Sequence, residues 1–373
     1  MHTTNVTSDR AGHTARFDRL RIGLIAPPWV PVPPTDYGGT ELVLDLLARG
    51  LHEAGHDVTL FTTGDATCEV PREWLYPTAK GTTASLVTEE AHVERAYELF
   101  AGMDVIHDHT LAGPTSFGLH PPGTPVITTN HGPFTEELRH LYATAARGSV
   151  AVVAISHDQR GRAPEVPVAS VIQHGIDVSP FRIGAGDGGY VAFLGRMHEN
   201  KGVHRAIEVA RAAGKRIVIA AKMWEPEERR YYAERVEPLL GDDAVYVGQV
   251  GGRSKIELLR GAEALVNPIR WPEPFGLEMI EALACGTPVV GFPEGAAPEI
   301  VEHGRSGYLC RDEDDMVAHL GKLGEIDRRA CRRRVEERFT AERMVADHVA
   351  LYRRLLADRS FPPETNPPLA LAG

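Results

Sequence analysis

The feature that most restricts the fold of this chain is a repeated alternation of short apolar runs with longer amphipathic stretches. The first run covers residues 21–26, and the stretch 40–54 after it spaces its leucines as one face of a helix does. Short apolar runs of this kind are typical of parallel strands that are buried on both faces. Strands that alternate with helices predict a doubly wound α/β sheet. Further strands are expected at residues 57–62, 104–107, 125–129 and 150–155.

The alternation pauses at residues 182–189 and then begins again. This segment, RIGAGDGG, holds four glycines and no apolar periodicity, so it is predicted to be a linker. A length of 373 residues suits two domains of roughly 150–200 residues each. The sequence therefore predicts two Rossmann-like domains facing across a cleft, with ligands at the carboxyl ends of the strands. After the linker we expect a helix at 203–213 and strands at 190–194, 216–220, 245–247, 264–267 and 288–291.

These patterns also divide the chain. We expect an N-terminal domain at residues 19–181 and a C-terminal domain at 190–340. The last helix, at 341–358, either belongs to the C-terminal domain or packs back on the N-terminal one. The two ends, 1–18 and 359–373, show no periodicity and are expected to be flexible.

The overall charge and the cysteines exclude several classes of protein. The chain has 40 Lys and Arg against 51 Asp and Glu, a formal charge of −11, which disfavours a nucleic-acid binder. No apolar run reaches the ~20 residues of a membrane helix, and residues 1–18 lack the apolar core of a secretory signal. The four cysteines form no C-x-x-C pair and are expected to be reduced thiols. We therefore expect a cytoplasmic protein.

The segment with the strongest chemical signal is 271–291, which reads WPEPFGLEMIEALACGTPVVG. Glu273 precedes a tight turn, and Glu281 lies about two turns into the helix that begins near Gly276. Carboxylates accept hydrogen bonds from pairs of sugar hydroxyls, and the helix N-terminus between them offers free N–H groups to a phosphate. An acidic helix N-terminus with ordinary capping is the alternative interpretation of this segment alone.

Two further loops carry residues suited to phosphate. Arg196 and Lys201 lie five residues apart in the loop 195–202, between an expected strand and an expected helix, so both cations can converge on one diphosphate. Two surface cations would be the plainer interpretation, and the spacing is not that of a Walker loop. Gly38 and Gly39 follow the first strand and allow backbone N–H groups to approach a ligand closely.

Taken together and in this order, these motifs resemble the family 4 glycosyltransferases, which have the two-domain GT-B fold. The resemblance is carried by the Gly-Gly first loop, the GR-x4-KG loop and the Glu-x7-Glu segment with FGL inside it. The segment 105–109, VIHDH, is similar to the family's strand-end histidine motif, and 175–177, GID, is similar to the motif before its linker. The similarity runs from about residue 21 to residue 309.

The resemblance implies a donor site for a nucleoside-diphosphate sugar. In that site Arg196 and Lys201 would bind the diphosphate, and Glu281 would hold the ribose hydroxyls. Glu273 would contact the transferred sugar. Backbone N–H groups would lie beside that sugar at Phe275, Gly276 and Leu277.

The resemblance also implies roles closer to the reacting atoms. Gly39 would bring backbone near the phosphate and the acceptor, His109 would contact the donor sugar, and the base would lie near Val250. The acceptor is expected on the N-terminal domain. Its candidate contacts are Trp29, Tyr37 and His131.

The reaction implied is transfer of a hexose-type sugar to an acceptor hydroxyl with retention of anomeric configuration. The leaving phosphate helps to deprotonate the acceptor, so no protein nucleophile, no metal and no cofactor beyond the nucleotide sugar is expected. The acceptor would be a natural product, a lipid carrier or a glycan. A nucleotide-sugar epimerase on the same fold and a non-catalytic nucleotide-sugar binding protein are the alternative functions. A phosphorylase is disfavoured because no segment suits its cofactor.

Some residues depart from the family pattern or carry weaker signals. Glu278 stands where a neutral residue is usual, and it either faces solvent or alters the donor site. Lys222 at a strand end is either a surface lysine or reaches the cleft. Residues 312–314, DED, match a metal signature of another fold, but acidic residues also favour a helix N-terminus, which we prefer. Six arginines between 328 and 338 are interpreted as a solvated helix face. The alternative is contact with anionic lipid at a membrane surface or with a phosphorylated acceptor, which the interspersed Glu336 and Glu337 disfavour.

Overall fold

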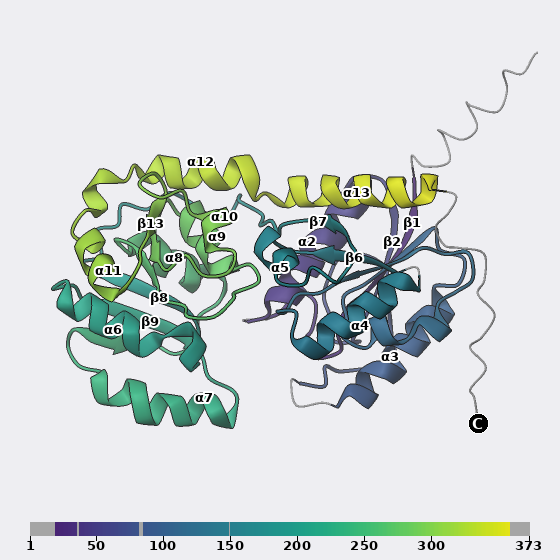
Figure 1. Cartoon of the computed structure of the whole chain (residues 1–373), viewed down its shortest axis with the longest axis horizontal. Helices are drawn as coiled ribbons and strands as arrows, with labels where there is room; N and C mark the ends of the chain where they lie inside the picture. Colours follow the sequence, from purple (N-terminus) through teal and green to yellow (C-terminus); the bar gives the residue numbers. More distant parts are fainter. Residues whose placement is uncertain (1–18, 36, 82–84, 149, 359–373) are drawn as a thin grey trace, which may run out of the picture.

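The computed structural model describes residues 19–35, 37–81, 85–148 and 150–358. In these ranges the chain forms two α/β domains side by side, each built on one parallel sheet, which confirms the predicted fold class (Figure 1). The ends for which flexibility is expected, 1–18 and 359–373, lie outside the described residues.

The N-terminal domain is built on a seven-stranded parallel sheet in the order β3-β2-β1-β4-β5-β6-β7. Its central strands are completely buried because helices cover both faces of the sheet. Its strands are β1 (Arg21–Ile25), β2 (Asp57–Thr62), β3 (Arg72–Trp74), β4 (Val105–Asp108), β5 (Val126–Thr129), β6 (Val150–Ala154) and β7 (Val168–Val171). Its helices are α2 (Gly39–Glu53), α3 (Leu86–Leu99), α4 (Glu136–Arg147) and α5 (His157–Gly161), with short turns η1 (Gly113–Thr115) and η2 (Phe117–Leu119).

The C-terminal domain is built on a six-stranded parallel sheet in the order β10-β9-β8-β11-β12-β13. Its strands are β8 (Val191–Arg196), β9 (Ile217–Lys222), β10 (Ala244–Tyr246), β11 (Leu265–Asn267), β12 (Val289–Gly291) and β13 (Gly307–Leu309). Its helices are α6 (Val203–Ala212), α7 (Pro226–Tyr231), α8 (Gly252–Gly261), α9 (Leu277–Ala284), α10 (Ala297–Ile300), α11 (Glu313–Leu320) and α12 (Arg328–Arg338). Shorter turns are η3 (Glu199–Lys201), η4 (Tyr232–Val236), η5 (Glu237–Leu239) and η6 (Leu323–Glu325).

Both sheets reverse their strand order once, and these reversals fix where a ligand can bind. In the first sheet β1 lies between β2 and β4, and in the second β8 lies between β9 and β11. Loops that leave such a pair of strands diverge to opposite faces, which opens a crevice at the carboxyl ends. Four loops that carry predicted site residues leave these strands: those that hold Gly39, His109, Lys201 and Glu273.

The chain crosses between the domains twice, and the two crossings are bonded to each other. Ile176 donates its N–H to the carbonyl of Phe339 at 2.9 Å, and Ala341 donates to the carbonyl of Ile176 at 3.0 Å. A Cβ added to Gly175 would lie 2.2 Å from the carbonyl oxygen of Thr340, so only glycine permits this approach. The crossings therefore form a double connection rather than two independent linkers.

The last helix, α13 (Ala341–Ala357), lies on the N-terminal domain although it follows the C-terminal one (Figure 1). Its apolar face, which includes Met344, Val349 and Tyr352, joins the core that α2 and β1 build. None of the helices in the described ranges has both the length and the apolar character that a membrane span requires.

The arginines of α12 correct one expectation from the sequence. We interpreted all six as a solvated face, and Arg329, Arg333 and Arg338 are exposed as predicted. Arg328 and Arg332 are instead partly buried and donate to carbonyls of the segment between the domains. Arg328 Nε donates to Gly184 at 2.7 Å, and Arg332 Nη1 donates to Phe181 at 2.8 Å. The prediction failed because the partners are backbone carbonyls about 150 residues away, which no local pattern of side chains reveals.

The contact between α2 and α13 predicts the effect of enlarging Gly50. A Cβ at Gly50 would lie 2.5 Å from Val345 Cγ2, so Gly50→Leu should overpack this interface and lower the free energy of unfolding by ~1–3 kcal/mol. Urea unfolding measures the change. Gly161→Leu is the matched control, because nothing lies within 4 Å of a Cβ there. Equal stability of the two variants would show that α13 is not packed on α2 in solution.

Candidate active site

A cavity of about 850 Å³ lies between the domains at the carboxyl ends of both sheets. The N-terminal domain contributes the start of α2 and the histidines His131 and His174, and the C-terminal domain contributes the ends of β8 and the starts of α8 and α9. Most of the predicted site residues line it, namely Tyr37, Gly39, His131, Lys201, Val250, Glu273, Phe275, Gly276, Leu277 and Glu281. Three predicted residues do not: Trp29, His109 and Arg196.

Two helix N-termini meet at this cavity, one from each domain. Helix α2 begins at Gly39 and α9 begins at Leu277, and a Cβ at Gly39 would lie 3.3 Å from Leu277 Cδ1. Gly276 precedes α9 in a left-handed conformation, with φ of 102°, where a Cβ would collide with Met279. The first N–H groups of both helices have no partner within the helix, so this point favours an anion.

Lys201 stands beside this point between two carboxylates. Its Nζ lies 2.6 Å from Glu273 Oε2 and 3.4 Å from Glu278 Oε1, and the residue is 8% exposed. Burial alone would lower the pKa of Lys201, but Glu273 and Glu278 outweigh it and raise that pKa above its ordinary value. Lys201 is therefore a permanent cation in the cavity wall. Trp271 Nε1 fixes Glu273 by donating to its Oε2 at 2.6 Å.

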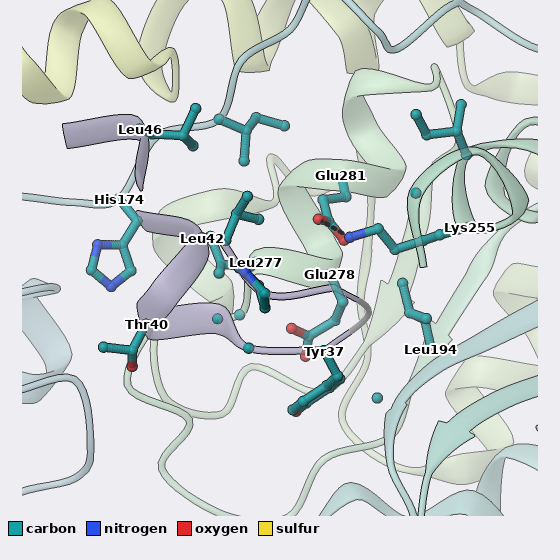
Figure 2. A pocket seen from close by; sticks show the side chains of 18 of the residues that line it. Tyr37, Thr40, Leu42, Leu46, His174, Leu194, Lys255, Leu277, Glu278 and Glu281 are labelled. Carbon is teal, nitrogen blue, oxygen red and sulfur yellow. Dashed lines mark hydrogen bonds and ion pairs between the residues drawn. The ribbon is translucent and has the colours of Figure 1, made fainter. Parts of the chain in front are cut away.

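Glu278 proves to be part of the site rather than a surface residue. It belongs to the first turn of α9, and its side chain points toward the cavity near Tyr37 (Figure 2). Burial raises the pKa of Glu278, while Lys201 acts in the opposite direction. The family resemblance did not account for this carboxylate.

Glu281, one turn further along α9, faces a cation that sequence reasoning missed. Lys255 Nζ, from the first turn of α8, lies 2.5 Å from Glu281 Oε1 (Figure 2). Lys255 follows the glycine pair 251–252. A glycine pair before a helix is the one local feature of the sequence that could have indicated a ligand-binding loop near Lys255. His174, which also lines the cavity, was missed because it lies in an irregular segment after an edge strand.

Arg196 is turned away from the cavity toward a buried carboxylate. Its Nε lies 3.7 Å from Glu228 Oε1, and Lys222 Nζ lies 3.5 Å from the same oxygen. Lys222 is 6% exposed, so of its two interpretations the surface lysine is wrong.

The predicted histidines form a row of rings that ends at the cavity. His109 lies behind His131, with its Nδ1 2.9 Å from His131 Nε2, and His131 stacks on His174 with ring centroids 5.2 Å apart. At the other end His107 lies 4.0 Å from the His109 ring and 5.3 Å from His348 of α13, measured between centroids. Burial lowers the pKa of His131 to about 3 and that of His348 to about 4, so both rings are neutral at pH 7.

Neutral rings impose a definite pattern on the His109–His131 pair. One nitrogen of the pair donates and the other accepts, so of the two outer nitrogens, His109 Nε2 and His131 Nδ1, one carries a proton and the other a lone pair. Neither outer nitrogen has a hydrogen-bond partner, and both are buried. A hydroxyl, which both donates and accepts, suits either nitrogen.

The remaining acceptor candidates occupy different places. Tyr37 lines the cavity and contacts Trp224 of the other domain edge-on, with centroids 5.9 Å apart. Trp29 lies outside the cavity lining, near Glu89 of α3. The first loop therefore presents Tyr37 to a ligand but not Trp29.

One group of side chains among the described residues brings metal-ligating atoms within 4.8 Å of one another, and it lies outside the cavity lining. It consists of Cys310, Asp315 and His319. His319 Nδ1 lies 2.8 Å from the carbonyl of Asp315, and Asp315 also pairs with Arg311. The neighbouring DED segment begins α11, and Asp312 caps it by accepting from Asp315 N.

The fold and the cavity together define a class of protein. Two Rossmann-like domains enclose an anion site made by helix N-termini and Lys201, and carboxylates able to hold sugar hydroxyls flank that site. This is the arrangement of a two-domain GT-B transferase.

Comparison with known proteins agrees with this class. The family described as Glycosyltransferase Family 4 matches residues 37–180, and the one described as Glycosyl transferases group 1 matches residues 188–325. The chain belongs to the family 4 glycosyltransferases, which confirms the resemblance found in the sequence.

Individual relatives resemble the chain to different extents. An alpha-maltose-1-phosphate synthase of Mycolicibacterium smegmatis is 28% identical over 345 residues, which cover 79% of this chain and 86% of that protein. An N-acetyl-alpha-D-glucosaminyl L-malate synthase of Bacillus anthracis is 32% identical over 117 residues, 29% of this chain and 31% of that protein. The crystal structure of AviGT4, a glycosyltransferase involved in avilamycin A biosynthesis, superposes with a TM-score of 0.68 at 26% identity, covering 91% of this chain and 98% of that one.

The histidine row predicts a specific response to acid. Burial lowers the folded-state pKa of His348 from 6.5 to about 4, so between these values the unfolded chain binds more protons than the folded one. The stability that His348 contributes is complete above pH 6.5 and is lost as the pH falls toward 4. His348→Gln should therefore reduce the loss of unfolding free energy between pH 7 and pH 5 by about 2 kcal/mol, measured by urea titration.

The matched control for this experiment is His140→Gln, because His140 is exposed. Burial raises the pKa values of Glu41 and Glu89 to about 7, so these two carboxyls make the folded state more stable as the pH falls, opposite to His348. Both variants keep these carboxyls, so the comparison cancels their contribution. If His348→Gln kept the pH dependence of the wild-type protein, His348 would not be buried and neutral.

Proposed function

We propose that this protein transfers a hexose-type sugar from a nucleoside-diphosphate sugar to an acceptor hydroxyl, with retention of anomeric configuration and without a metal ion. The observation that carries the proposal is the convergence of Lys201, the N-terminus of α9 and two glutamates on one cavity between the domains. A nucleotide sugar needs these groups together, since its diphosphate is an anion and both of its ends carry hydroxyl pairs.

The donor fits this cavity with its parts in a fixed order. The diphosphate would lie against the N-terminus of α9 and Lys201, and Arg196 would turn from Glu228 to join it. The ribose would lie at Glu281, displacing Lys255, and the base near Val250. The sugar would lie at Glu273, beside the backbone N–H groups of Phe275, Gly276 and Leu277.

The chemistry follows from where charge develops. As the bond between the sugar carbon and the diphosphate breaks, negative charge grows on the leaving oxygen, where fixed cations and N–H groups lower the barrier. The acceptor oxygen would form its bond on the same face and give its proton to the leaving phosphate, so no nucleophile of the chain is required. Gly39, Tyr37 and His131 supply the acceptor side, with His109 behind His131.

The acceptor of this proposal is a natural product, a lipid carrier or a glycan. The relatives are named for products as different as an L-malate glycoside and maltose 1-phosphate. The donor half of the site is therefore the part that an experiment can address first.

The first test is donor binding by calorimetry with UDP-, GDP-, ADP- and TDP-glucose. We expect one donor to bind and Lys201→Ala to weaken it by ~10–100-fold, because a charge-assisted hydrogen bond contributes about 1.5–3 kcal/mol. Lys322→Ala, at an exposed position, is the control. Absence of binding by every donor, or equal binding by Lys201→Ala, would contradict the proposal. Once an acceptor is found, the anomeric configuration of the product measured by NMR tests retention.

A substitution at Glu278 provides a second test, in which binding is expected to become tighter rather than weaker. A diphosphate that approaches Lys201 also approaches this carboxylate, which lies 3.4 Å from the lysine. Glu278→Gln removes that negative charge and should tighten the binding of nucleoside diphosphates severalfold, an effect that added salt reduces. Asp314→Asn, which removes a carboxylate from the first turn of α11, should leave binding unchanged. Weaker binding by Glu278→Gln would mean that the diphosphate does not lie beside Lys201.

A further inference from the structure

Lys222 has no role in the site as described so far, although it lies at the same sheet edge. Strands β8 and β9 pair in parallel with Arg196 opposite Lys222, so both cations stand at the carboxyl ends of neighbouring strands. This edge is where a doubly wound sheet binds its ligand.

The burial of Lys222 needs an explanation. The residue is 6% exposed, and a buried ammonium is costly unless it is paired. Its ion-pair partner is Glu228, which is 1% exposed and lies 3.5 Å from it. Lys222 and Glu228 therefore form a buried ion pair at the carboxyl end of β9 rather than a solvated surface contact.

Glu228 divides its two oxygens between different tasks. Oε2 accepts the backbone N–H groups of Trp224 at 2.7 Å and Glu225 at 3.1 Å, which fixes the carboxylate in place. Oε1 makes no hydrogen bond and faces both Arg196 at 3.7 Å and Lys222 at 3.5 Å. Two cations thus share one carboxylate oxygen loosely, which leaves a local surplus of positive charge.

The aromatic rings of Trp224 and Tyr37 lie between the Lys222 ammonium and the cavity. Lys222 Nζ lies 4.4 Å from the ring centroid of Trp224 and 5.7 Å from that of Tyr37, which lines the cavity. Tyr37 belongs to the N-terminal domain and lies near Glu278 (Figure 2). Burial raises the pKa of the Tyr37 hydroxyl most, Glu278 and Glu273 also raise it, and Lys201 and Arg196 act to lower it. Lys222 therefore lies beside the group of cations and carboxylates at the Tyr37 end of the cavity.

We propose that Lys222 is a third phosphate-binding cation, held beside Arg196 by Glu228 and contacting the distal phosphate of the nucleoside diphosphate. The inference rests on the proposed function, since it concerns the same donor. Trp224 and Tyr37 exclude water from the ammonium, which strengthens its interaction with a phosphate oxygen. Glu228 is a positioning residue in this arrangement, since it fixes both cations without neutralising both.

The test compares nucleoside diphosphates with monophosphates, because only the former have the distal phosphate. Calorimetry with UDP, GDP, ADP and TDP and the four monophosphates identifies the nucleotide that the wild-type protein binds. Lys222→Met should weaken the diphosphate about tenfold and the monophosphate no more than about twofold. Lys215→Met is the matched control, since Lys215 is a paired lysine just before the opposite end of β9.

A second variant keeps the proposal testable if Lys222→Met does not fold. Glu228→Gln retains the shape of the side chain and an oxygen for the Trp224 and Glu225 N–H groups, but leaves both cations without a counter-charge. Inorganic pyrophosphate should then raise the melting temperature of Glu228→Gln more than that of the wild-type protein. A smaller or equal rise would contradict the assignment.

The outcomes separate this inference from the proposed function. If the wild-type protein binds no nucleoside diphosphate, both fail. If the wild-type protein binds one and Lys201→Ala weakens it, but Lys222→Met binds both nucleotides as the wild-type protein does, only the role of Lys222 is overturned. Equal weakening of diphosphate and monophosphate by Lys222→Met would also overturn it, since that pattern indicates a structural role.

Discussion

The cavity depends on the hydrogen-bonded pair of crossings between the domains. Backbone groups of Ile176, Phe339 and Ala341 join the two crossings, so neither segment can move without the other. Arginines of α12 hold the adjacent segment through its carbonyls, and Glu299 of α10 accepts N–H groups from His157 and Asp158 at the start of α5. These contacts join backbone to backbone, or the side chains of Arg328, Arg332 and Glu299 to backbone, and together they place the two sheet edges. The opposed N-termini of α2 and α9 follow from this placement.

Charge pairing is the second principle of the site. Four cations at or beside the cavity are paired with carboxylates: Lys201 has Glu273 and Glu278, Lys255 has Glu281, and Arg196 and Lys222 share Glu228. Such pairs make buried charge tolerable, but the net stability they contribute is small because desolvation offsets the attraction. An anionic ligand with hydroxyls can take over both halves of a pair, since its phosphates replace the carboxylates and its hydroxyls donate to them. The same residues thus serve the fold and the proposed chemistry.

Much of this arrangement could be predicted from the sequence, and the failures have a common cause. Buried central strands such as β6 and the helix N-terminus at Gly276 have local signals, an apolar run and a glycine beside acidic residues. Edge strands such as β3 and β7 were not predicted because their side chains are partly exposed and form no continuous apolar run. The partners of Arg196, Lys255 and Arg332 lie 26 to 154 residues away, and only the fold brings them together. Predicted residues therefore line the cavity where their motif is local, and contacts were missed where the pairing is long-range.

The central claim is that the cleft between α2 and α9 binds the diphosphate of a nucleotide sugar. A crystal structure with the nucleoside diphosphate that calorimetry selects would test it most directly. We predict density for the diphosphate within hydrogen-bond distance of Lys201 Nζ and the first N–H groups of α9, with the ribose at Glu281. Density for the same ligand outside this cleft, at a concentration that saturates binding, would contradict the account.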